Sequence, residues 1–254
     1  MAAELQPHRS RYWRNAKAQA EDPVAFAAAV ETICTVYAYA PMLEALGCHV
    51  VSTDEMTGIQ ALERAAPTKP MRSGCPERRE HEYIRHGTTT LIANFNVATG
   101  AVLAPTLGPS RTEDDFAAHI AQTIATDPDA RWLFLADNRN THQSGALVRL
   151  VAARCALPDV LGVKGQAGIL HTMPTRAAFL ADPAHRIQFL YTPKHTSWLK
   201  QIERWFSLLV RRVLKRGTFA STDALRERIR AFIASFNQTA TPFTWTYTGR
   251  PLCR

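Results

Sequence analysis

Cysteines are scarce in this 254-residue sequence, and no two of them form a recognisable pair. The five cysteines stand singly, at positions 34, 48, 75, 155 and 253, with no C-x-x-C motif and no close Cys/His spacing. Zinc sites need clustered ligands and disulfide scaffolds need paired cysteines, so neither kind of protein is expected. The odd number of cysteines indicates a reduced protein of the cytoplasm.

Segments that would indicate several other protein classes are also missing. The basic start of the chain is followed by no apolar region, so no signal peptide is expected. The most apolar segment, Ala25 to Leu46, is interrupted by Glu31, Pro41 and Glu44, and no membrane partner is expected. There is no G-x-x-x-x-G-K-[ST] loop and no G-x-S-x-G motif, which disfavours nucleotide-driven motors and common serine hydrolases.

The sequence does contain enough apolar residues for a core, and it has a surplus of basic residues. Hydrophobic residues make up 46% and charged residues 20%, which excludes general disorder. Lysine and arginine number 30 against 22 acidic residues, so the formal net charge is +8. A chain of this length forms one large domain or one domain with a small addition, and its charge indicates a polyanionic partner.

Strand and helix signals alternate along the chain. Strands are expected at 49–54, 88–97, 101–106, 131–136 and 187–191, with a hairpin turn at 98–100. A first helix is expected at 23–38; it breaks near Pro41, resumes and ends at Gly47. Further helices are expected to begin at 112 and to span 144–155, 175–181, 197–216 and 222–236. This order predicts an α/β protein with a mixed five-stranded sheet and helices on both faces.

Two aspartates follow strands of the buried type directly. Asp54 follows the strand that begins at His49, and Asp137 follows the continuous apolar run RWLFLA. A single aspartate in such a place is usually a turn or capping residue. If the two strands are adjacent and parallel, however, both carboxylates lie at the same edge of the sheet, where ligands gather. Two neighbouring carboxylates need a cation between them, and oxygen ligands suit Mg²⁺ or Mn²⁺.

A third acid lies on the apolar face of the helix expected at 197–216. The apolar positions repeat with the period of a helix, at Leu199, Ile202, Phe206, Leu209, Val210 and Val213. Glu203 falls within this stripe and therefore faces the sheet. A carboxylate in that position needs a partner. The partner is either an arginine or a metal ion shared with Asp54 and Asp137.

Three ordered strings resemble one family. They are STDEMTGIQALER (52–64), LADNRNTHQS (135–144) and YTPKHTSWLKQIERWFSLLVRRVLKRGTF (191–219), and NQTATPFTWTYTG (237–249) is similar to the same family's C-terminal end. The family is that of bacterial insertion-sequence transposases, in the mariner-like branch of the DDE superfamily. The resemblance covers almost the whole chain and implies a ribonuclease H-like fold.

The resemblance also implies roles for individual residues. Asp54, Asp137 and Glu203 match the catalytic, metal-binding acids. Asn138, His142 and Trp198 match positions that order the site. The implied chemistry is phosphoryl transfer with two Mg²⁺ or Mn²⁺ ions, in which DNA is cleaved at transposon ends and joined to target DNA.

The chain departs from the family pattern at two places. The spacing between Asp137 and Glu203 is longer than in many mariner-like enzymes, and the surplus falls in a Gly/Pro-rich segment at about 157–186. The usual N-terminal helix-turn-helix region is absent, through truncation, a split reading frame or a separate partner chain. We therefore expect a basic lead-in and helix at 1–46, a catalytic domain at 47–236 with the insertion, and a C-terminal tail at 237–254.

Basic residues gather in two parts of the sequence. Nine basic residues oppose three acidic ones between 198 and 230, and four oppose Glu4 within 1–20. Backbone contacts to DNA are expected for the residues nearest the acids and for the lead-in, although a solvated surface would have the same composition. The expected DNA-binding residues are Arg9, Arg11, Arg14, Lys200, Arg204, Arg211, Arg212, Lys215 and Arg216.

Two other functions remain open from the sequence. One is a decayed or domesticated domain that binds DNA without cutting it, and the other is a ribonuclease H-like nuclease that is not a transposase. For the transposase, family analogy favours a homodimer on two double-stranded DNA ends. Such a protein would be cytoplasmic and associated with the nucleoid when bound to DNA.

Overall fold

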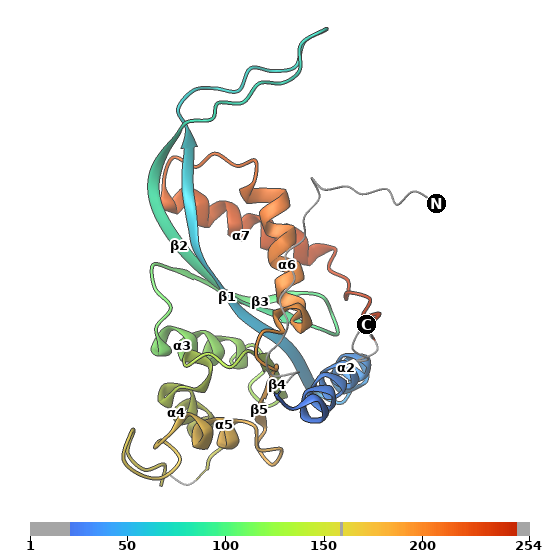
Figure 1. Cartoon of the computed structure of the whole chain (residues 1–254), viewed down its shortest axis with the longest axis vertical. Helices are drawn as coiled ribbons and strands as arrows, with labels where there is room; N and C mark the ends of the chain where they lie inside the picture. The colour runs from blue at the N-terminus through green and yellow to red at the C-terminus, as the bar shows by residue number, and fades with distance from the viewer. Residues whose placement is uncertain (1–20, 158–159, 248–254) are drawn as a thin grey trace.

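The computed structural model describes residues 21–157 and 160–247. Its centre is a five-stranded mixed sheet in the order β3-β2-β1-β4-β5 (Figure 1). The strands are β1 (Cys48–Arg64), β2 (Tyr83–Asn96), β3 (Val102–Gly108), β4 (Arg131–Ala136) and β5 (Ile187–Tyr191). β1, β2 and β3 pair in antiparallel fashion, whereas β4 runs parallel to both β1 and β5. The expected α/β fold and the hairpin between β2 and β3 are confirmed.

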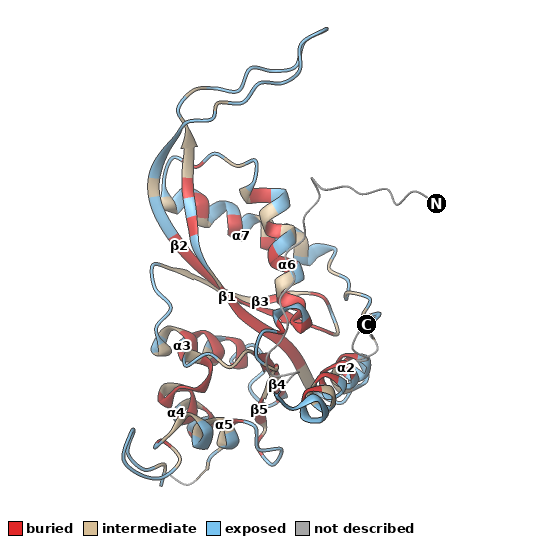
Figure 2. Ribbon diagram, viewed as in Figure 1, coloured by how far each residue is buried: buried red, intermediate tan, exposed pale blue. Residues whose placement is uncertain are grey.

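Helices cover both faces of the sheet. On one face lie α3 (Glu113–Ile124), α4 (Gly145–Arg154) and α5 (Met173–Leu180), and on the other lie α2 (Pro23–Ala45), α6 (Gln201–Leu209) and α7 (Thr222–Gln238). Buried residues line both sides of the central strands, as Figure 2 shows. The segment between β1 and β2 extends away from the body at the top of Figure 1. The sheet is therefore the middle layer of three.

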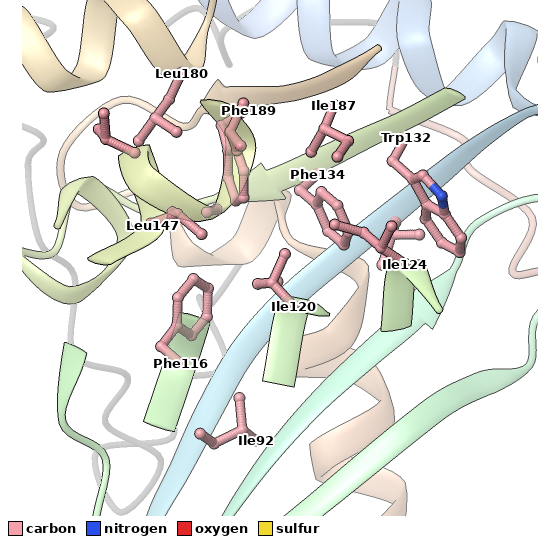
Figure 3. Packing of buried hydrophobic residues seen from close by; sticks show 14 of the residues in the cluster. Ile92, Phe116, Ile120, Ile124, Trp132, Phe134, Leu147, Leu180, Ile187 and Phe189 are labelled. Atoms are coloured by element: carbon pink, nitrogen blue, oxygen red, sulfur yellow. The ribbon is translucent and has the colours of Figure 1, made fainter. Parts of the chain in front are cut away.

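The core under α3 and α4 is rich in aromatic residues. Trp132, Phe134 and Phe189 stack in sequence across β4 and β5, with ring centroids 5.7 and 5.1 Å apart. Phe116 and Ile120 of α3 pack on the same cluster (Figure 3). Each such side chain removes a large apolar area from water, worth about 1.5–3 kcal/mol. This packing holds β4 and β5 parallel, and with them the end of β4 at Asp137.

The strand that carries Asp54 is longer than expected. It continues through the polar residues after Asp54 to Arg64, because β2 pairs with it along its whole second half. Asp54 thus lies within β1, opposite Ala93 of β2, and does not follow the strand. The prediction of a short strand ending at position 54 is wrong, since local polarity ends an isolated strand but a pairing partner extends it.

The register between β1 and β4 aligns the two aspartates. Cys48 pairs with Arg131 and Ser52 pairs with Leu135, and continuing this parallel register brings Asp54 opposite Asp137. Side chains alternate between the two faces along a strand. Asp54 therefore shares the face of Ser52, while Asp137 shares that of Leu135, which packs in the α2 core. Both carboxylates point to the face covered by α2 and α6.

Helix α2 does not break at Pro41. It runs without interruption from Pro23 to Ala45, capped by the Asp22 side chain, so the expected break is wrong. Pro41 lies in the last turns of the helix, where packing of the preceding turns on the sheet keeps the chain helical. By length and composition alone α2 resembles a membrane span, but it packs through Val30, Ile33 and Tyr37 against the sheet.

The long helix expected at 197–216 is divided into three pieces. A 3₁₀ turn at Ser197–Leu199 is followed by α6, and α6 continues into a π-helical turn at Val210–Leu214. Lys200 has an extended backbone between the first two pieces, with φ −83° and ψ 120°. The expectation of one continuous helix is therefore wrong. The interruption turns the side chain of Lys200 into the core, where it is only 2% exposed.

A charged contact joins α2 to the start of β1. His49 Nδ1 lies 3.0 Å from Glu44 Oε1, and Nε2 lies 3.0 Å from Asp127 Oδ2. Burial opposes protonation of His49, but the hydrogen bonds and charges of Asp127 and Glu44 outweigh it and raise its pKa above the ordinary 6.5. The contact therefore stabilises the fold when His49 is protonated.

We predict that His49→Gln destabilises the protein only at low pH. Because the folded pKa is raised, the contribution is fully present below about pH 6.5 and is lost as the pH rises through the folded value. We expect a loss of about 1 kcal/mol at pH 6 from the hydrogen bonds of the charged ring. Urea unfolding of both proteins between pH 5.5 and 9 measures the difference. A loss that grows with pH would contradict this account.

Candidate active site

Two carboxylates and a buried lysine meet at the junction of β1 and β4. Lys200 Nζ contacts Asp54 Oδ2 and lies 3.4 Å from Asp137 Oδ2. Asp54 is 3% exposed and the Lys200 side chain 1% exposed, so their charges are removed from water. An isolated buried carboxylate is very costly, and the lysine supplies its counter-charge.

The third acid reaches the same place from α6. Glu203 is half-buried in the first turn of α6, close enough to Asp54 and Asp137 for their charges to act on it. Burial and the charge of Asp54 raise the pKa of Glu203 to about 7, against the opposing effect of Lys200. Three carboxylates that are distant in sequence thus lie near one another on one face of the sheet. The raised pKa reports an excess of negative charge that a further cation would relieve.

The second oxygen of Asp137 belongs to another buried network. His142 Nδ1 lies 2.7 Å from Asp137 Oδ1, and His142 Nε2 lies 3.2 Å from Glu55 Oε1. The side chains of His142 and Glu55 are fully buried. Arg139 approaches both acids, at 3.3 Å from Asp137 and 3.4 Å from Glu55. Since Glu55 follows Asp54 in β1, it points to the opposite face of the sheet.

The charges in this network stabilise one another. Burial disfavours the charged form of His142, but its hydrogen bonds to Asp137 and Glu55 raise its pKa to about 9. Burial likewise opposes ionisation of Asp137, but His142, Lys200 and Arg139 together hold its pKa well below the usual range. The histidine is therefore an imidazolium at neutral pH, and Asp137 is ionised.

The donor chemistry favours the three carboxylates as the metal site. The ligand atoms of Asp54, Glu55 and His142 lie within 4.8 Å of one another, which is a spacing that suits an ion. However, both ring nitrogens of His142 already face carboxylates, and a protonated ring cannot bind a metal. Asp54, Asp137 and Glu203 offer hard oxygen ligands on one face of the sheet, and these suit Mg²⁺ or Mn²⁺.

The residues expected to order the site have distinct positions. Asn138 donates from Nδ2 to the carbonyl of Thr192 at 2.6 Å and accepts from Gln143 at 2.9 Å, so it ties the ends of β4 and β5 together. His142 bridges Asp137 and Glu55, as described above. Trp198 is 51% exposed and meets Tyr247 edge-on. Trp198 therefore lies beside the acids without bridging them.

A cavity of about 340 Å³ opens beside Glu203. It is lined by Trp198, Lys200, Gln201, Glu203, Arg204, Ser207, Phe243, Thr244 and Trp245. The segment from Phe243 to Trp245 is anchored on the core, because Phe243 stacks on Phe95 at 4.7 Å. The cavity gives solvent access to Glu203 and reaches Lys200 from the α6 side.

The residues expected to bind DNA divide into three groups. Arg9, Arg11 and Arg14 lie outside the described residues. The exposed group on α6 and the turns that follow it consists of Arg204, Arg211, Arg212, Lys215 and Arg216. Lys200 is buried between Asp54 and Asp137, and its assignment as a surface contact to DNA is wrong for this structure. The reason is the helix interruption at Lys200.

Sequence reasoning missed Glu55, Arg139 and the inward position of Lys200. A signal for Glu55 was present, since two consecutive acids in a strand must point to opposite faces. A buried acid on each face requires a cation on each face. Arg139 and His142, which follow Asp137 closely in the sequence, supply the positive charge on the face of Glu55. Only folding brings Lys200 to the face of Asp54.

The fold and the acid cluster together define a class of protein. A mixed sheet of this order with helices on both faces and carboxylates gathered at the β1–β4 junction is the arrangement of ribonuclease H-like, metal-dependent nucleases and transferases. The sequence profile of the DDE superfamily endonucleases matches residues 49–226. This chain belongs to that family, so the expected DDE endonuclease domain and the expectation of an enzyme are confirmed.

The chain is also similar to solved structures of a mariner transposase. They include the Mos1 mariner paired end complex with Mn (13% identity, TM-score 0.52), the Mos1 transposase paired-end complex with left transposon end (13%, 0.53) and a pre-cleavage Mos1 transpososome (12%, 0.53). Each match covers 92% of this chain and 60% of the Mos1 chain. At this identity the likeness confirms the ribonuclease H-like fold. No curated protein sequence matches the chain.

We predict that Glu55→Ala destabilises the protein by about 3 kcal/mol, because it leaves a buried imidazolium without one of its two carboxylates. Arg139→Ala is the matched control. It removes another cation-to-Glu55 contact, but the Arg139 side chain is 46% exposed, so the loss is at most about 1 kcal/mol.

Urea unfolding in EDTA at pH 7 measures both values. Equal losses of unfolding free energy in the two variants would show that the His142–Glu55 pair stabilises the fold no more than the Arg139–Glu55 pair does.

Proposed function

We propose that this chain is the catalytic part of a transposase that cleaves DNA at the ends of a mobile element and joins those ends to target DNA. The observation that carries the proposal is the meeting of Asp54, Asp137 and Glu203 on one face of the sheet. The similar Mos1 structures are a paired end complex and a paired-end complex with left transposon end, and they support DNA ends as the substrate. The bacterial insertion-sequence origin is part of the same proposal.

Asp54 and Asp137 would hold the metal ions, and Glu203 would complete the ligand set from α6. When bound, the divalent ions activate the attacking water or 3′-hydroxyl and stabilise the leaving oxygen. The protein's contribution is rigid placement. Ser52 accepts a hydrogen bond from the backbone N–H of Ile202 at 3.2 Å, which fixes α6 against β1 next to Asp54. No protein nucleophile is needed for this chemistry.

His142, Glu55 and Arg139 are positioning residues in this proposal. His142 pairs with Asp137 Oδ1, and Arg139 lies 3.3 Å from Oδ2, so both cations help to keep Asp137 ionised. Glu55 holds the His142 ring through Nε2. Asn138 fixes the backbone after Asp137 through its bonds to Thr192 and Gln143. Such outer partners of metal ligands commonly matter 10- to 100-fold for metal binding or activity.

Further features of the proposal come from the family resemblance. They are two Mg²⁺ or Mn²⁺ ions, a homodimer on two DNA ends, and end recognition by a separate helix-turn-helix chain. The proposal also includes a bacterial, cytoplasmic location. It divides the chain into a basic lead-in with a helix at 1–46, a catalytic domain at 47–236 and a C-terminal tail at 237–254. A Mos1 paired end complex with Mn supports Mn²⁺ as one of the two metals.

A nicking assay tests the proposed activity. The 254-residue chain is incubated with supercoiled plasmid and with oligonucleotides of the element's ends, in Mg²⁺, Mn²⁺ or EDTA. Asp137→Asn and Glu203→Gln are expected to lower metal-dependent nicking by at least about 100-fold, because each removes a charged metal ligand. Asp129→Asn and Glu227→Gln, which change exposed acids in the same way, are the matched controls and are expected to nick like the wild type.

The outcomes of this assay separate three functions. Binding without nicking in either metal would identify a DNA-binding remnant and overturn the catalytic proposal. Nicking of structured DNA with no preference for element ends and no joined products would identify a nuclease that is not a transposase. Nicking that survives both Asp137→Asn and Glu203→Gln would show that the acids are wrongly assigned.

The exposed basic residues after Glu203 are proposed to contact the DNA backbone. We predict that Arg211→Gln/Arg212→Gln weakens binding to all duplexes alike and reduces the salt dependence of log K by about 2, since each phosphate contact contributes about 0.9. The matched control is Arg149→Gln/Arg154→Gln, two exposed arginines of α4 on the opposite face. Fluorescence anisotropy at several salt concentrations measures the slopes. Equal slopes for the two double variants would contradict this surface.

A further inference from the structure

Lys200 lies between two proposed metal ligands, although the proposed two-metal chemistry assigns it no role. Its ammonium group contacts Asp54 Oδ2 and lies 3.4 Å from Asp137 Oδ2, between the two carboxylates of the acid cluster. The side chain is 1% exposed, so it cannot serve as a surface contact while it is there. We propose that Lys200 is a resident counter-cation of the active site, which divalent ions must displace when they bind. This inference rests on the proposed function.

The backbone on both sides of Lys200 is fixed. Tyr37 donates from its hydroxyl to the carbonyl of Leu199 at 2.7 Å, and the Ile202 N–H donates to Ser52 at 3.2 Å. Leu199 and Ile202 are fully buried, one in the α2 core and the other in the α6 core. Only the side chain of Lys200 is therefore free to move when the site changes its charge.

The ammonium and a divalent ion compete for the same oxygens. An ion held by Asp54 and Asp137 would draw on the same two carboxylates that Lys200 now contacts. Two cations cannot share that space, because their mutual repulsion in a buried site is large. Metal binding and the Lys200–Asp54 contact therefore exclude each other.

The structure offers the displaced side chain a place to go. Lys200 lines the cavity of about 340 Å³ beside Glu203, together with Ser207 and the aromatic residues of the C-terminal segment. A long flexible lysine can turn into this space without moving its backbone. In the cavity its ammonium would stand at the entrance to the site, next to exposed Arg204.

Two consequences follow for the protein. Before ions bind, Lys200 offsets part of the negative charge of the two aspartates and reduces the destabilisation that their repulsion causes. When ions bind, they must first break this contact, so Lys200 weakens metal affinity and raises the metal concentration that the site needs. The residue thus sets the threshold for metal loading.

Lysine labelling of the wild-type chain tests the displacement directly. The full chain is treated briefly with an amine-reactive reagent in EDTA and at saturating Mn²⁺, and the modified lysines are quantified by mass spectrometry. Lys200 is expected to be protected in EDTA and labelled at least about ten times faster in Mn²⁺, because its amine becomes accessible. Lys194, exposed in the segment before the 3₁₀ turn, is the internal control and should not change.

Calorimetric titration with Mn²⁺ supplies a second readout. Lys200→Met keeps the length of the side chain and removes the competing charge, so it is expected to bind Mn²⁺ about ten times more tightly than the wild type. Arg204→Met removes one positive charge from the next turn of the chain without a contact to the aspartates, and a change of less than about twofold is expected. The labelling experiment stands even where Lys200→Met fails to fold without metal.

The outcomes distinguish this inference from the proposed function. Mn²⁺ binding with Lys200 still protected, or with affinity unchanged or weaker in Lys200→Met, would overturn the displacement and leave the proposed function intact. A wild-type chain that binds no Mn²⁺ or Mg²⁺ would overturn both. Faster labelling of Lys200 in Mn²⁺ with tighter binding by Lys200→Met supports the inference.

Discussion

The parallel pairing of β1 with β4 is the constraint on which the rest of the structure depends. Its register, from Cys48 opposite Arg131 to Ser52 opposite Leu135, brings Asp54 and Asp137 to the same height on the same face of the sheet. Two carboxylates held so close repel each other strongly in a buried site. The surrounding structure can be understood as the set of cations and hydrogen bonds that make this pairing tolerable.

Those compensating groups come from both faces of the sheet. On the α6 face, Lys200 contacts both aspartates, while on the other face His142 and Arg139 contact Asp137 and Glu55. Asp137 takes part in both networks: its Oδ1 pairs with His142, and its Oδ2 lies near both Lys200 and Arg139. A change on one face is therefore transmitted electrostatically to the other. Burial and the charge of Asp54 raise the pKa of Glu203, which marks the side of the cluster where positive charge is still lacking.

Much of the fold could be predicted, and the errors have physical causes. The apolar run RWLFLA is β4 without change of boundary, because a strand buried on both faces needs hydrophobic residues throughout. The capping box at Thr112 likewise marks the start of α3 in the sequence. The end of β1 was missed, since pairing with β2 extends a polar strand. The break at Lys200 was missed as well, because periodicity continues across it.

For this protein the sequence alone determined the family, the order of the elements, the three acids and the basic surface beyond Glu203. Each of these depends on residue type and local pattern, which an amino-acid sequence carries. Only the tertiary structure decided that Lys200 lies between the two aspartates and that His142 and Arg139 contact Asp137 and Glu55 from the other face of the sheet. Lys200 and the arginines near it look equivalent along the chain. A single extended residue turns one of them inward, and that turn is held by long-range hydrogen bonds from Tyr37 and to Ser52.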